Sequence, residues 1–131
     1  MPITVLVADD AEIVRRAIRS LLMLYPAIQI VGEAGNFAQT IQMAKDLKPQ
    51  VIVMDLHMSR EGHGLDHDLQ SCLSDGSTLL AISISNDEKA EEFARSLGAV
   101  KLLDKMNLYN ELIPAIIHLA SSANAQAETA D

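Results

Sequence analysis

The sequence predicts an α/β fold in which helices cover both faces of a parallel β-sheet. Apolar runs of strand length alternate five times with segments of helical periodicity along the 131 residues. The run 51–54 is continuously apolar, which is typical of a strand buried on both faces. One acid, Asp55, follows this run directly, and two acids follow the first run, 3–8. We found no internal repeat and no linker that would indicate a second domain.

The first βα unit consists of a strand at 3–8 and a helix at 11–25, which Pro26 ends. Apolar residues at helical spacing form one stripe of this helix: Ile13, Val14, Ala17, Ile18, Leu21, Leu22 and Tyr25. Three arginines lie off the stripe, at Arg15, Arg16 and Arg19. These arginines are expected to lie on a solvated face of the helix. The alternative is that they form a surface that binds an acidic partner.

The second unit begins with a short strand at 29–31. Asn36 is suited to cap the following helix, which extends to about Leu47. Four apolar residues are expected on its inner side: Phe37, Ile41, Ala44 and Leu47. Pro49 stops this helix, because a proline disfavours helical backbone geometry in the residue before it. The strand 51–54 follows, with Asp55 at its carboxyl end.

The third and fourth units are separated by a turn at 74–76. After the loop 58–64, a weak helix is expected at 65–73, with Leu65, Leu69 and Leu73 on one side. The fourth strand is predicted at 78–83. Ser85 and Glu88 then fit a capping box, in which a hydroxyl residue is followed three positions later by Glu. The helix carries Ala90, Phe93, Ala94 and Leu97 inward and ends at Gly98.

The last unit consists of a strand at 100–103 and a helix at about 108–120. Pro114 lies inside this helix and should kink it or mark a late start. Residues 121–131 are small and polar, which indicates a disordered tail after a single folded domain at 1–120.

Composition restricts the classes of protein. No apolar run reaches the roughly 18 residues that a membrane-spanning helix needs, and the amino terminus has no signal-peptide pattern. The single cysteine, Cys72, cannot form an internal disulfide, which suits a reducing, cytoplasmic location. A formal charge of −8 argues against nucleic-acid binding by this chain, and the absence of Trp argues against a base-stacking surface.

The strand ends predict a cation site. Because parallel strands bring their carboxyl ends to one edge, Asp9, Asp10, Asp55, Ser83 and Lys105 should meet there. Carboxylates repel a phosphate unless a cation lies between them, and Mg²⁺ prefers such oxygen ligands. Asp55 could also act as a nucleophile that forms an aspartyl phosphate. A hydroxyl donor and a lysine charge would complete a site for phosphoryl transfer.

The sequence resembles the response-regulator receiver domains of two-component signalling, most closely those of NarL/LuxR-type regulators. The resemblance covers residues 3 to about 120. It rests on an ordered set of motifs: Val7-Ala8-Asp9-Asp10, Val53-Met54-Asp55-Leu56-His57-Met58, Ile82-Ser83, Gly98-Ala99 and Lys105. It implies a flavodoxin-like (CheY-like) doubly wound sheet of five parallel strands in the order 2-1-3-4-5.

The resemblance also implies a role for each site residue. The carboxylates of Asp9, Asp10 and Asp55 and the backbone carbonyl of His57 hold Mg²⁺. Asp55 accepts a phosphoryl group from a histidine kinase. Three further positions bind the phosphoryl oxygens: Ser83, Lys105 and the backbone at Ile84.

Four positions depart from the family pattern. A proline is usual where Ser59 stands, and another usually follows the lysine, where Met106 stands. A small residue is usual in place of Ile84, which could crowd the phosphoryl pocket. Leu102 replaces the aromatic residue whose rotation is commonly coupled to the hydroxyl. We therefore expect phosphorylation to be retained and the signalling step to differ.

The remaining residues give weaker hypotheses. The side chain of His57 could tune water access and the lifetime of the phosphoryl group. His63 and His67, four residues apart, could share a helix face as metal ligands, but no cysteine partner stands at ligand spacing. Cys72 is expected to be an ordinary, partly buried thiol. Four acids favour a solvated helix over a partner surface: Asp87, Glu88, Glu91 and Glu92.

The leading interpretation is a phosphorylation-dependent signalling protein that is not an enzyme beyond assisting its own phosphorylation. Its expected partners are a histidine kinase or phosphotransfer protein and a downstream protein, with homodimerisation left open and no membrane partner. Alternatives are the receiver of a longer DNA-binding regulator and a degenerate receiver that acts by contact alone. A phosphatase with an aspartate nucleophile is a further alternative, but such enzymes usually carry a second acid two residues after the nucleophile, where this chain has His57. A flavin-binding module of the same fold is another alternative, but the sequence lacks the phosphate-binding loop that such a module needs after the strand 3–8.

Overall fold

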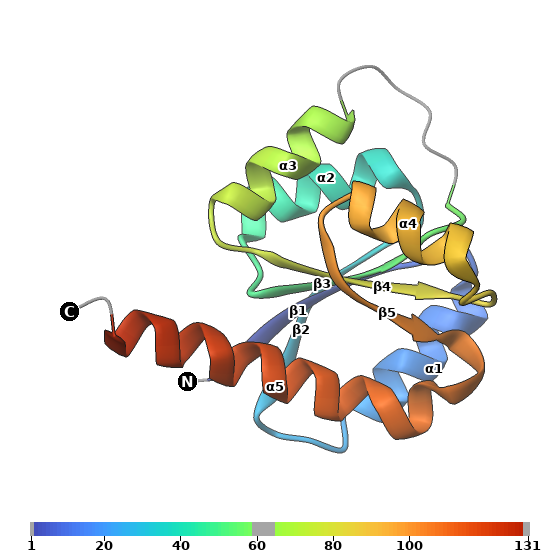
Figure 1. The fold of residues 1–131 in the computed structure, drawn as a ribbon. Helices are drawn as coiled ribbons and strands as arrows, with labels where there is room; N and C mark the ends of the chain where they lie inside the picture. Colours follow the sequence, from blue (N-terminus) through green and yellow to red (C-terminus); the bar gives the residue numbers. More distant parts are fainter. Residues whose placement is uncertain (1, 59–64, 130–131) are drawn as a thin grey trace.

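The computed structural model describes residues 2–58 and 65–129 (Figure 1). Its elements follow one another in the predicted alternation. They are β1 (Ile3–Ala8), α1 (Glu12–Leu22), β2 (Ile28–Ala34), α2 (Phe37–Leu47), β3 (Val51–Asp55), α3 (Leu65–Ser74), β4 (Thr78–Ser83), α4 (Glu88–Ser96), β5 (Ala99–Asp104), a short 3-10 helix η1 (Lys105–Asn107) and α5 (Leu108–Thr129).

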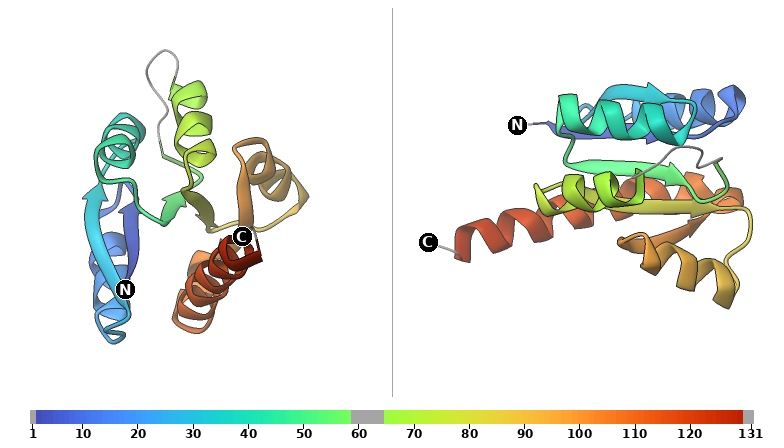
Figure 2. Two further views of the ribbon diagram at one scale, coloured as in Figure 1. Left: turned by 90° about the vertical axis from the view of Figure 1, so that its left-hand side faces the viewer. Right: turned by 90° about the horizontal axis from the view of Figure 1, so that it is seen from above.

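The five strands form one parallel sheet in the order β2-β1-β3-β4-β5, which confirms the predicted topology. Helices α1 and α5 cover one face, and α2, α3 and α4 cover the other (Figures 1 and 2). The three central strands are therefore covered on both sides and shielded from water. This burial is the physical reason why their sequences are almost uninterrupted apolar runs.

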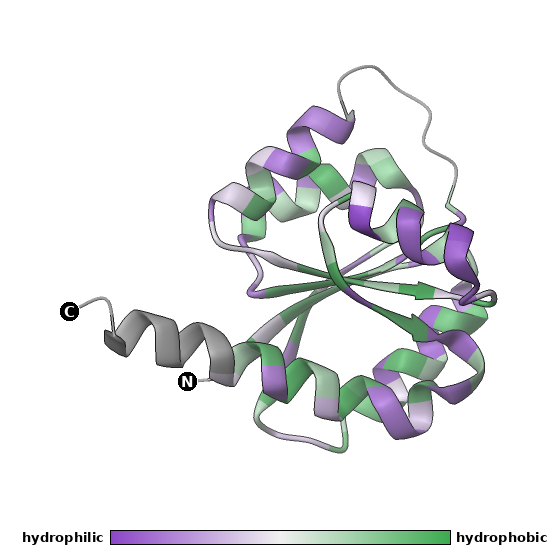
Figure 3. Cartoon of the chain, viewed as in Figure 1, coloured by the Kyte–Doolittle hydropathy of each residue, from purple (hydrophilic) through white to green (hydrophobic). Residues whose placement is uncertain are grey.

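The side chains of the central strands alternate between two cores. One core lies against α1 and α5 and takes from the strands Val5, Val7, Val51, Val53, Leu80, Ile82 and Leu103. The other lies against α2, α3 and α4 and takes Leu6, Ala8, Ile52, Met54, Leu79 and Ala81. The ribbon of the central strands is coloured mostly hydrophobic in Figure 3, as expected for strands that contribute to both cores. Two-sided burial holds the strand ends in fixed positions, and the polar residues follow those ends directly.

The caps of two helices test the local sequence signals. Asn36 caps α2 as predicted, since its Oδ1 accepts a hydrogen bond from the backbone N–H of Gln39 at 2.8 Å. The predicted capping box at Ser85 is wrong, because Asp87 caps α4 and accepts from the N–H of Ala90 at 2.9 Å. That hydrogen bond lowers the pKa of Asp87. The backbone N–H of Ser85 instead donates to Ser83 Oγ, at 3.0 Å, so Ser85 belongs to the site at the sheet edge.

The amino-terminal elements differ from the predicted bounds. Helix α1 ends at Leu22 rather than Tyr25, and β2 extends to Ala34 rather than Val31 because its pairing with β1 continues to Ala34, opposite Ala8. The apolar stripe of α1 is also broader than the core. Ile18 and Leu22 are buried, whereas Ile13 is 77% exposed.

Helix α5 corrects two expectations about the carboxyl end. It starts at Leu108 with Pro114 inside it, so the proline does not mark a late start, and it continues to Thr129 rather than ending near Ala120. Residues 121–129 contain three alanines and neither Gly nor Pro. Alanine has the highest helix propensity, so a composition that suggested a tail also suits a helix. Within the described residues, no helix combines the length and the apolar character that crossing a membrane requires.

Candidate functional site

The strand register brings the predicted site residues to one edge of the sheet. Ala8 pairs with Met54, so Asp9, which directly follows β1, and Asp55, the last residue of β3, lie at the ends of neighbouring strands. Across the other side of β3, Asp55 pairs with Ile82, and Ser83 follows. Ser83 pairs in turn with Asp104, and Lys105 begins η1.

Lys105 lies between two buried carboxylates. Its Nζ is 2.7 Å from Asp9 Oδ2 and 3.2 Å from Asp55 Oδ2. The side chain of Asp9 is fully buried, that of Asp55 is 3% exposed, and that of Lys105 is 14% exposed. Since an unpaired buried carboxylate is costly, the ammonium group is what makes this pair of acids tolerable in the absence of another cation.

The electrostatics of Lys105 follow from this position. Burial alone would lower the pKa of the ammonium group. The hydrogen bond to Asp9 and the negative charges of Asp55 and Asp9 act in the opposite direction, and together they raise the pKa above its usual value of 10.5. Lys105 is therefore a cation at neutral pH, and its charge is available at the sheet edge.

Backbone groups hold the two buried acids in place. Asp9 Oδ1 accepts from the N–H of Ala11 at 2.9 Å, and Asp55 Oδ1 accepts from the N–H of His57 at 3.0 Å. Each acid therefore directs one oxygen toward a backbone donor and the other toward Lys105. This arrangement fixes the carboxylate planes.

The geometry fits a hard divalent cation. Carboxylate oxygens of Asp9, Asp10 and Asp55 lie within 4.8 Å of one another. Asp9 Oδ2 is buried and receives no hydrogen bond from a neutral donor among the described residues. Asp10 is exposed, which leaves one side open to water molecules or phosphate oxygens. Mg²⁺ is bound in proteins in this way, by one or two carboxylates together with water and phosphate oxygens.

Ser83 lies at the same edge, and its hydroxyl is already engaged. The residue is fully buried, and its Oγ accepts from the N–H of Ser85 at 3.0 Å. On its other side the hydroxyl lies 2.9 Å from Nε2 of His57. Sequence reasoning placed His57 near the site but did not predict that its ring contacts Ser83, a residue 26 positions away.

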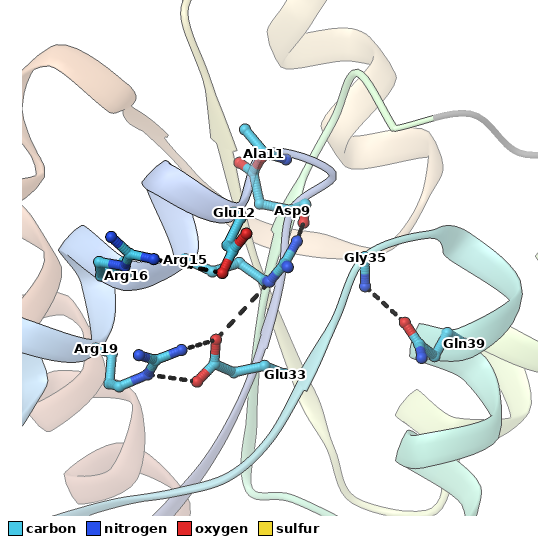
Figure 4. Close-up of polar contacts among 9 residues, drawn as sticks. All are labelled: Asp9, Ala11, Glu12, Arg15, Arg16, Arg19, Glu33, Gly35 and Gln39. Atoms are coloured by element: carbon cyan, nitrogen blue, oxygen red, sulfur yellow. Dashed lines mark hydrogen bonds and ion pairs between the residues drawn. The ribbon is translucent and has the colours of Figure 1, made fainter.

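An arginine cluster beside the acids was also missed. Arg19 makes a bidentate ion pair with Glu33, at 2.7 and 2.8 Å, and Arg15 lies 3.8 Å from the same carboxylate (Figure 4). Arg15 also donates to the backbone carbonyl of Asp9. The signal available in the sequence was the spacing of Arg15 and Arg19, which are four apart and share a helix face. These arginines pair within the chain, which leaves less of their charge for an acidic partner.

This cluster predicts a pH dependence. The hydrogen bond from Arg19 and the charges of Arg19 and Arg15 lower the pKa of Glu33, against a smaller opposing effect of burial. Glu33 therefore stabilises the fold above its usual pKa of about 4.5, and this contribution is lost as the pH falls through the lowered value. We expect Glu33→Gln to be slightly less stable than the parent at pH 7 in urea unfolding.

The difference between Glu33→Gln and the parent should shrink as the unfolding series is taken below pH 4. Glu92→Gln, at an exposed position on α4, is the control and should track the parent throughout. A stability gap for Glu33→Gln that stays constant down to acid pH would contradict the assignment.

The four departures from the family pattern fall in different environments. Ser59 lies outside the described residues. Leu102 is partly buried against the α2, α3 and α4 core. Met106 lies in η1, which Asp104 caps by accepting a hydrogen bond on Oδ1 from the N–H of Met106 at 2.9 Å. Ile84 is 70% exposed, so its side chain lies at the surface rather than in a buried pocket.

Ile84 lines an apolar groove beside the site. The groove has a volume of about 500 Å³ and lies between α1 and the start of α5, with Lys105 in its wall. Four of its apolar residues are strongly exposed: Ile13, Ile84, Met106 and Tyr109. An exposed apolar surface of this kind marks a place where a protein partner can bind.

The other candidate residues remain separate from the site. His67 is exposed on α3, while His63 lies outside the described residues, so the proposed histidine pair stays a prediction. Cys72 is buried as a free thiol, and burial raises the pKa of that thiol. The four acids of the α4 region are exposed, as expected for a solvated face: Asp87, Glu88, Glu91 and Glu92.

Residues 5–117 match the family model described as the response regulator receiver domain. Among curated proteins, the transcriptional regulatory protein LiaR of Bacillus subtilis is 35% identical over 117 residues, which are 87% of this chain and 54% of LiaR. The nitrate/nitrite response regulator NarL of Escherichia coli is 32% identical over 122 residues, 92% of this chain and 56% of NarL. The chain thus spans about half the length of these relatives.

Solved structures show the same relationship. The signal receiver domain of a NarL response regulator from Mycobacterium tuberculosis superposes with a TM-score of 0.81 at 25% identity, covering 92% of this chain and 97% of that domain. The response regulator domain of Thermotoga maritima CheB has a TM-score of 0.78 at 22% identity, covering 91% and 96% of the two chains. The second likeness supports the fold.

Proposed function

Because this chain belongs to the response regulator receiver family, we propose that it accepts a phosphoryl group on Asp55 from a histidine kinase or a phosphotransfer protein. One observation carries the proposal: Lys105 Nζ bridges Asp9 and Asp55, 2.7 and 3.2 Å away, at the edge where three acids meet. The nucleophile and the charges that phosphoryl transfer needs are therefore in one place.

In this proposal, Mg²⁺ is held by the carboxylates of Asp9, Asp10 and Asp55 and by the backbone carbonyl of His57. When bound, it supplies positive charge that neutralises the phosphoryl oxygens. The remaining work falls to the protein. A carboxylate oxygen of Asp55 forms a bond to phosphorus as the bond from phosphorus to the donor breaks. The donor leaves with its electron pair and takes up a proton from water.

Three groups of the chain assist this step. The backbone N–H of His57 orients the Asp55 carboxylate through Oδ1. Lys105 offers its charge to a phosphoryl oxygen on the Oδ2 side. The hydroxyl of Ser83 and the backbone at Ile84 take further phosphoryl oxygens. Each donor acts where negative charge accumulates in the transition state.

The partner side of the proposal is supported by the apolar groove. A protein donor that reaches Asp55 would meet the exposed side chains of Ile13, Ile84 and Met106 beside Lys105. Phosphorylation would then change binding to a downstream protein, drive homodimerisation or pass the group along a phosphorelay. The proposal includes a cytoplasmic location, where the free thiol of Cys72 stays reduced.

A second candidate is the receiver part of a longer DNA-binding regulator. It is favoured by the comparison with LiaR and NarL, about half of whose length the chain matches. Because a net charge of −8 disfavours binding to phosphate backbones, DNA binding in this case would belong to a separate domain. A degenerate receiver is less well supported, because Asp9, Asp55 and Lys105 are in direct contact.

The test is the intact mass of the protein after incubation with a small acyl phosphate, with and without Mg²⁺. We expect one added phosphoryl group in the presence of Mg²⁺, no adduct without it, and none in Asp55→Asn. This variant keeps the shape of the side chain and removes its nucleophilic charge. Failure of the folded parent to form an adduct or to bind beryllofluoride would favour the degenerate receiver.

A further inference from the structure

The hydroxyl of Ser83 lies between two groups other than Asp55. Its oxygen accepts from the N–H of Ser85 at 3.0 Å, and Nε2 of His57 lies 2.9 Å away on the other side. Ser83 is fully buried, whereas His57 is exposed on the loop after β3. The exposed ring therefore reaches down to a buried hydroxyl at the sheet edge.

The proton count makes this contact consequential. A serine hydroxyl has one proton to donate and two lone pairs with which to accept. In Ser83, the N–H of Ser85 occupies one lone pair. If the His57 ring is neutral with its proton on Nδ1, Nε2 is an acceptor and takes the one proton of the hydroxyl. A phosphoryl oxygen on Asp55 needs that same proton, because it can only accept.

We propose that His57 is a latch that holds the Ser83 hydroxyl away from Asp55 in the unphosphorylated protein. This inference rests on the proposed function, since it concerns the same phosphoryl site. The hydrogen bond from Ser83 to His57 must break before the hydroxyl can donate to the phosphoryl group. His57 thus shifts the equilibrium toward the unphosphorylated arrangement, and it acts as a positioning residue through Ser83.

The latch replaces part of what Leu102 cannot do. In receivers with an aromatic residue at that position, rotation of the ring is coupled to the hydroxyl, whereas Leu102 has no ring to rotate. Here the imidazole of His57, on the loop after β3, contacts the hydroxyl directly. Its exposure leaves it free to turn into solvent when the hydroxyl is released.

The first measurement determines the tautomer of the His57 ring in the metal-free protein. Long-range proton–nitrogen NMR spectra distinguish the two neutral tautomers of a histidine. We expect the Nδ1–H tautomer at His57 in the parent and a change of its Nε2 resonance in Ser83→Ala. The Nε2–H tautomer in the parent would overturn the proposal, because a ring that donates to Ser83 leaves the hydroxyl proton free.

The second measurement is the affinity for beryllofluoride, a phosphoryl mimic, in the presence of Mg²⁺. We expect His57→Ala to bind beryllofluoride about three- to tenfold more tightly than the parent, the effect of removing one net hydrogen bond from the competing state. His118→Ala, at an exposed position on α5, is the control and should match the parent.

A double-mutant cycle shows whether the effect runs through Ser83. In the Ser83→Ala background the His57→Ala change should leave beryllofluoride affinity unaltered, because no hydroxyl remains to be held. Weaker or unchanged binding by His57→Ala, or an equal gain in both backgrounds, would overturn the latch alone. A parent that binds no beryllofluoride would overturn the proposed function as well, so the two failures are distinguishable.

Discussion

Replacing Lys105 with methionine is expected to destabilise the metal-free protein by about 3 kcal/mol. This is the lower end of the cost of breaking a buried ion pair, because the lysine side chain still reaches solvent. Methionine keeps much of the length of lysine and removes its charge. The variant leaves Asp9 and Asp55 buried without the ammonium group 2.7 and 3.2 Å away. Urea unfolding at pH 7 measures the loss.

The same variant should respond more strongly to Mg²⁺. A bound divalent cation and the ammonium group compensate the same carboxylates, so Mg²⁺ should stabilise Lys105→Met by more than it stabilises the parent. Adduct formation from an acyl phosphate should nevertheless slow by roughly 100-fold or more, as is usual when a donor to the developing charge is removed. The two effects separate the structural role of Lys105 from the role proposed for it in phosphoryl transfer.

The pH dependence follows from the raised pKa of Lys105. A group whose pKa is raised by folding contributes stability below its usual value, about 10.5, and loses it as the pH rises through the folded-state value. The gap between parent and variant should therefore persist from pH 7 to pH 10. Lys101→Met, at an exposed position on β5, is the control. An equal response of Lys105→Met and Lys101→Met to Mg²⁺ would contradict the assignment.

The sheet and the set of acids could be predicted because burial leaves a direct trace in sequence. Strands covered on both faces are apolar throughout, as in β3, and the first polar residue after each run marks the strand end. The rules of parallel sheets then bring Asp9, Asp55 and Ser83 together without any knowledge of side-chain conformations. The cap of α2 was predictable for a similar reason, since Asn36 had no nearby competitor.

Local signals failed where two of them overlapped. Ser85 and Asp87 are both good capping residues, and the helix begins directly after Asp87, at Glu88. Ser85 is drawn to Ser83 by a hydrogen bond that no local pattern reports. The prediction for the carboxyl end of α5 failed for a different reason, because small and polar residues with several alanines are compatible with both a helix and a disordered segment.

The contacts inside the site could not be predicted from sequence. Arg19 and Glu33 are 14 residues apart, and His57 and Ser83 are 26 apart. Each contact depends on strand twist, loop path and side-chain rotamers together. Spacing identifies which residues share an edge of the sheet, but distances of 2.7 and 2.9 Å decide which of them are hydrogen bonded. The latch on Ser83 is therefore visible only in three dimensions.

The two phenylalanines of the chain offer a matched test of the core that supports the site. Phe37 is 1% exposed in the core beneath α2, whereas Phe93 on α4 is only partly buried. We expect Phe37→Ala to destabilise the protein by about 3–5 kcal/mol, through lost burial and the cavity that remains. Phe93→Ala should cost clearly less, because solvent can occupy part of the space that its ring leaves.

Urea unfolding with an unchanged slope would show that both values report stability rather than a change in the denatured state. The loss in Phe37→Ala is a large share of the 5–15 kcal/mol that holds an ordinary domain together. Beryllofluoride with Mg²⁺ should recover part of it, since a ligand that binds only the folded state stabilises that state by mass action. Equal losses in the two variants would show that the core beneath α2 is not packed around Phe37 as described.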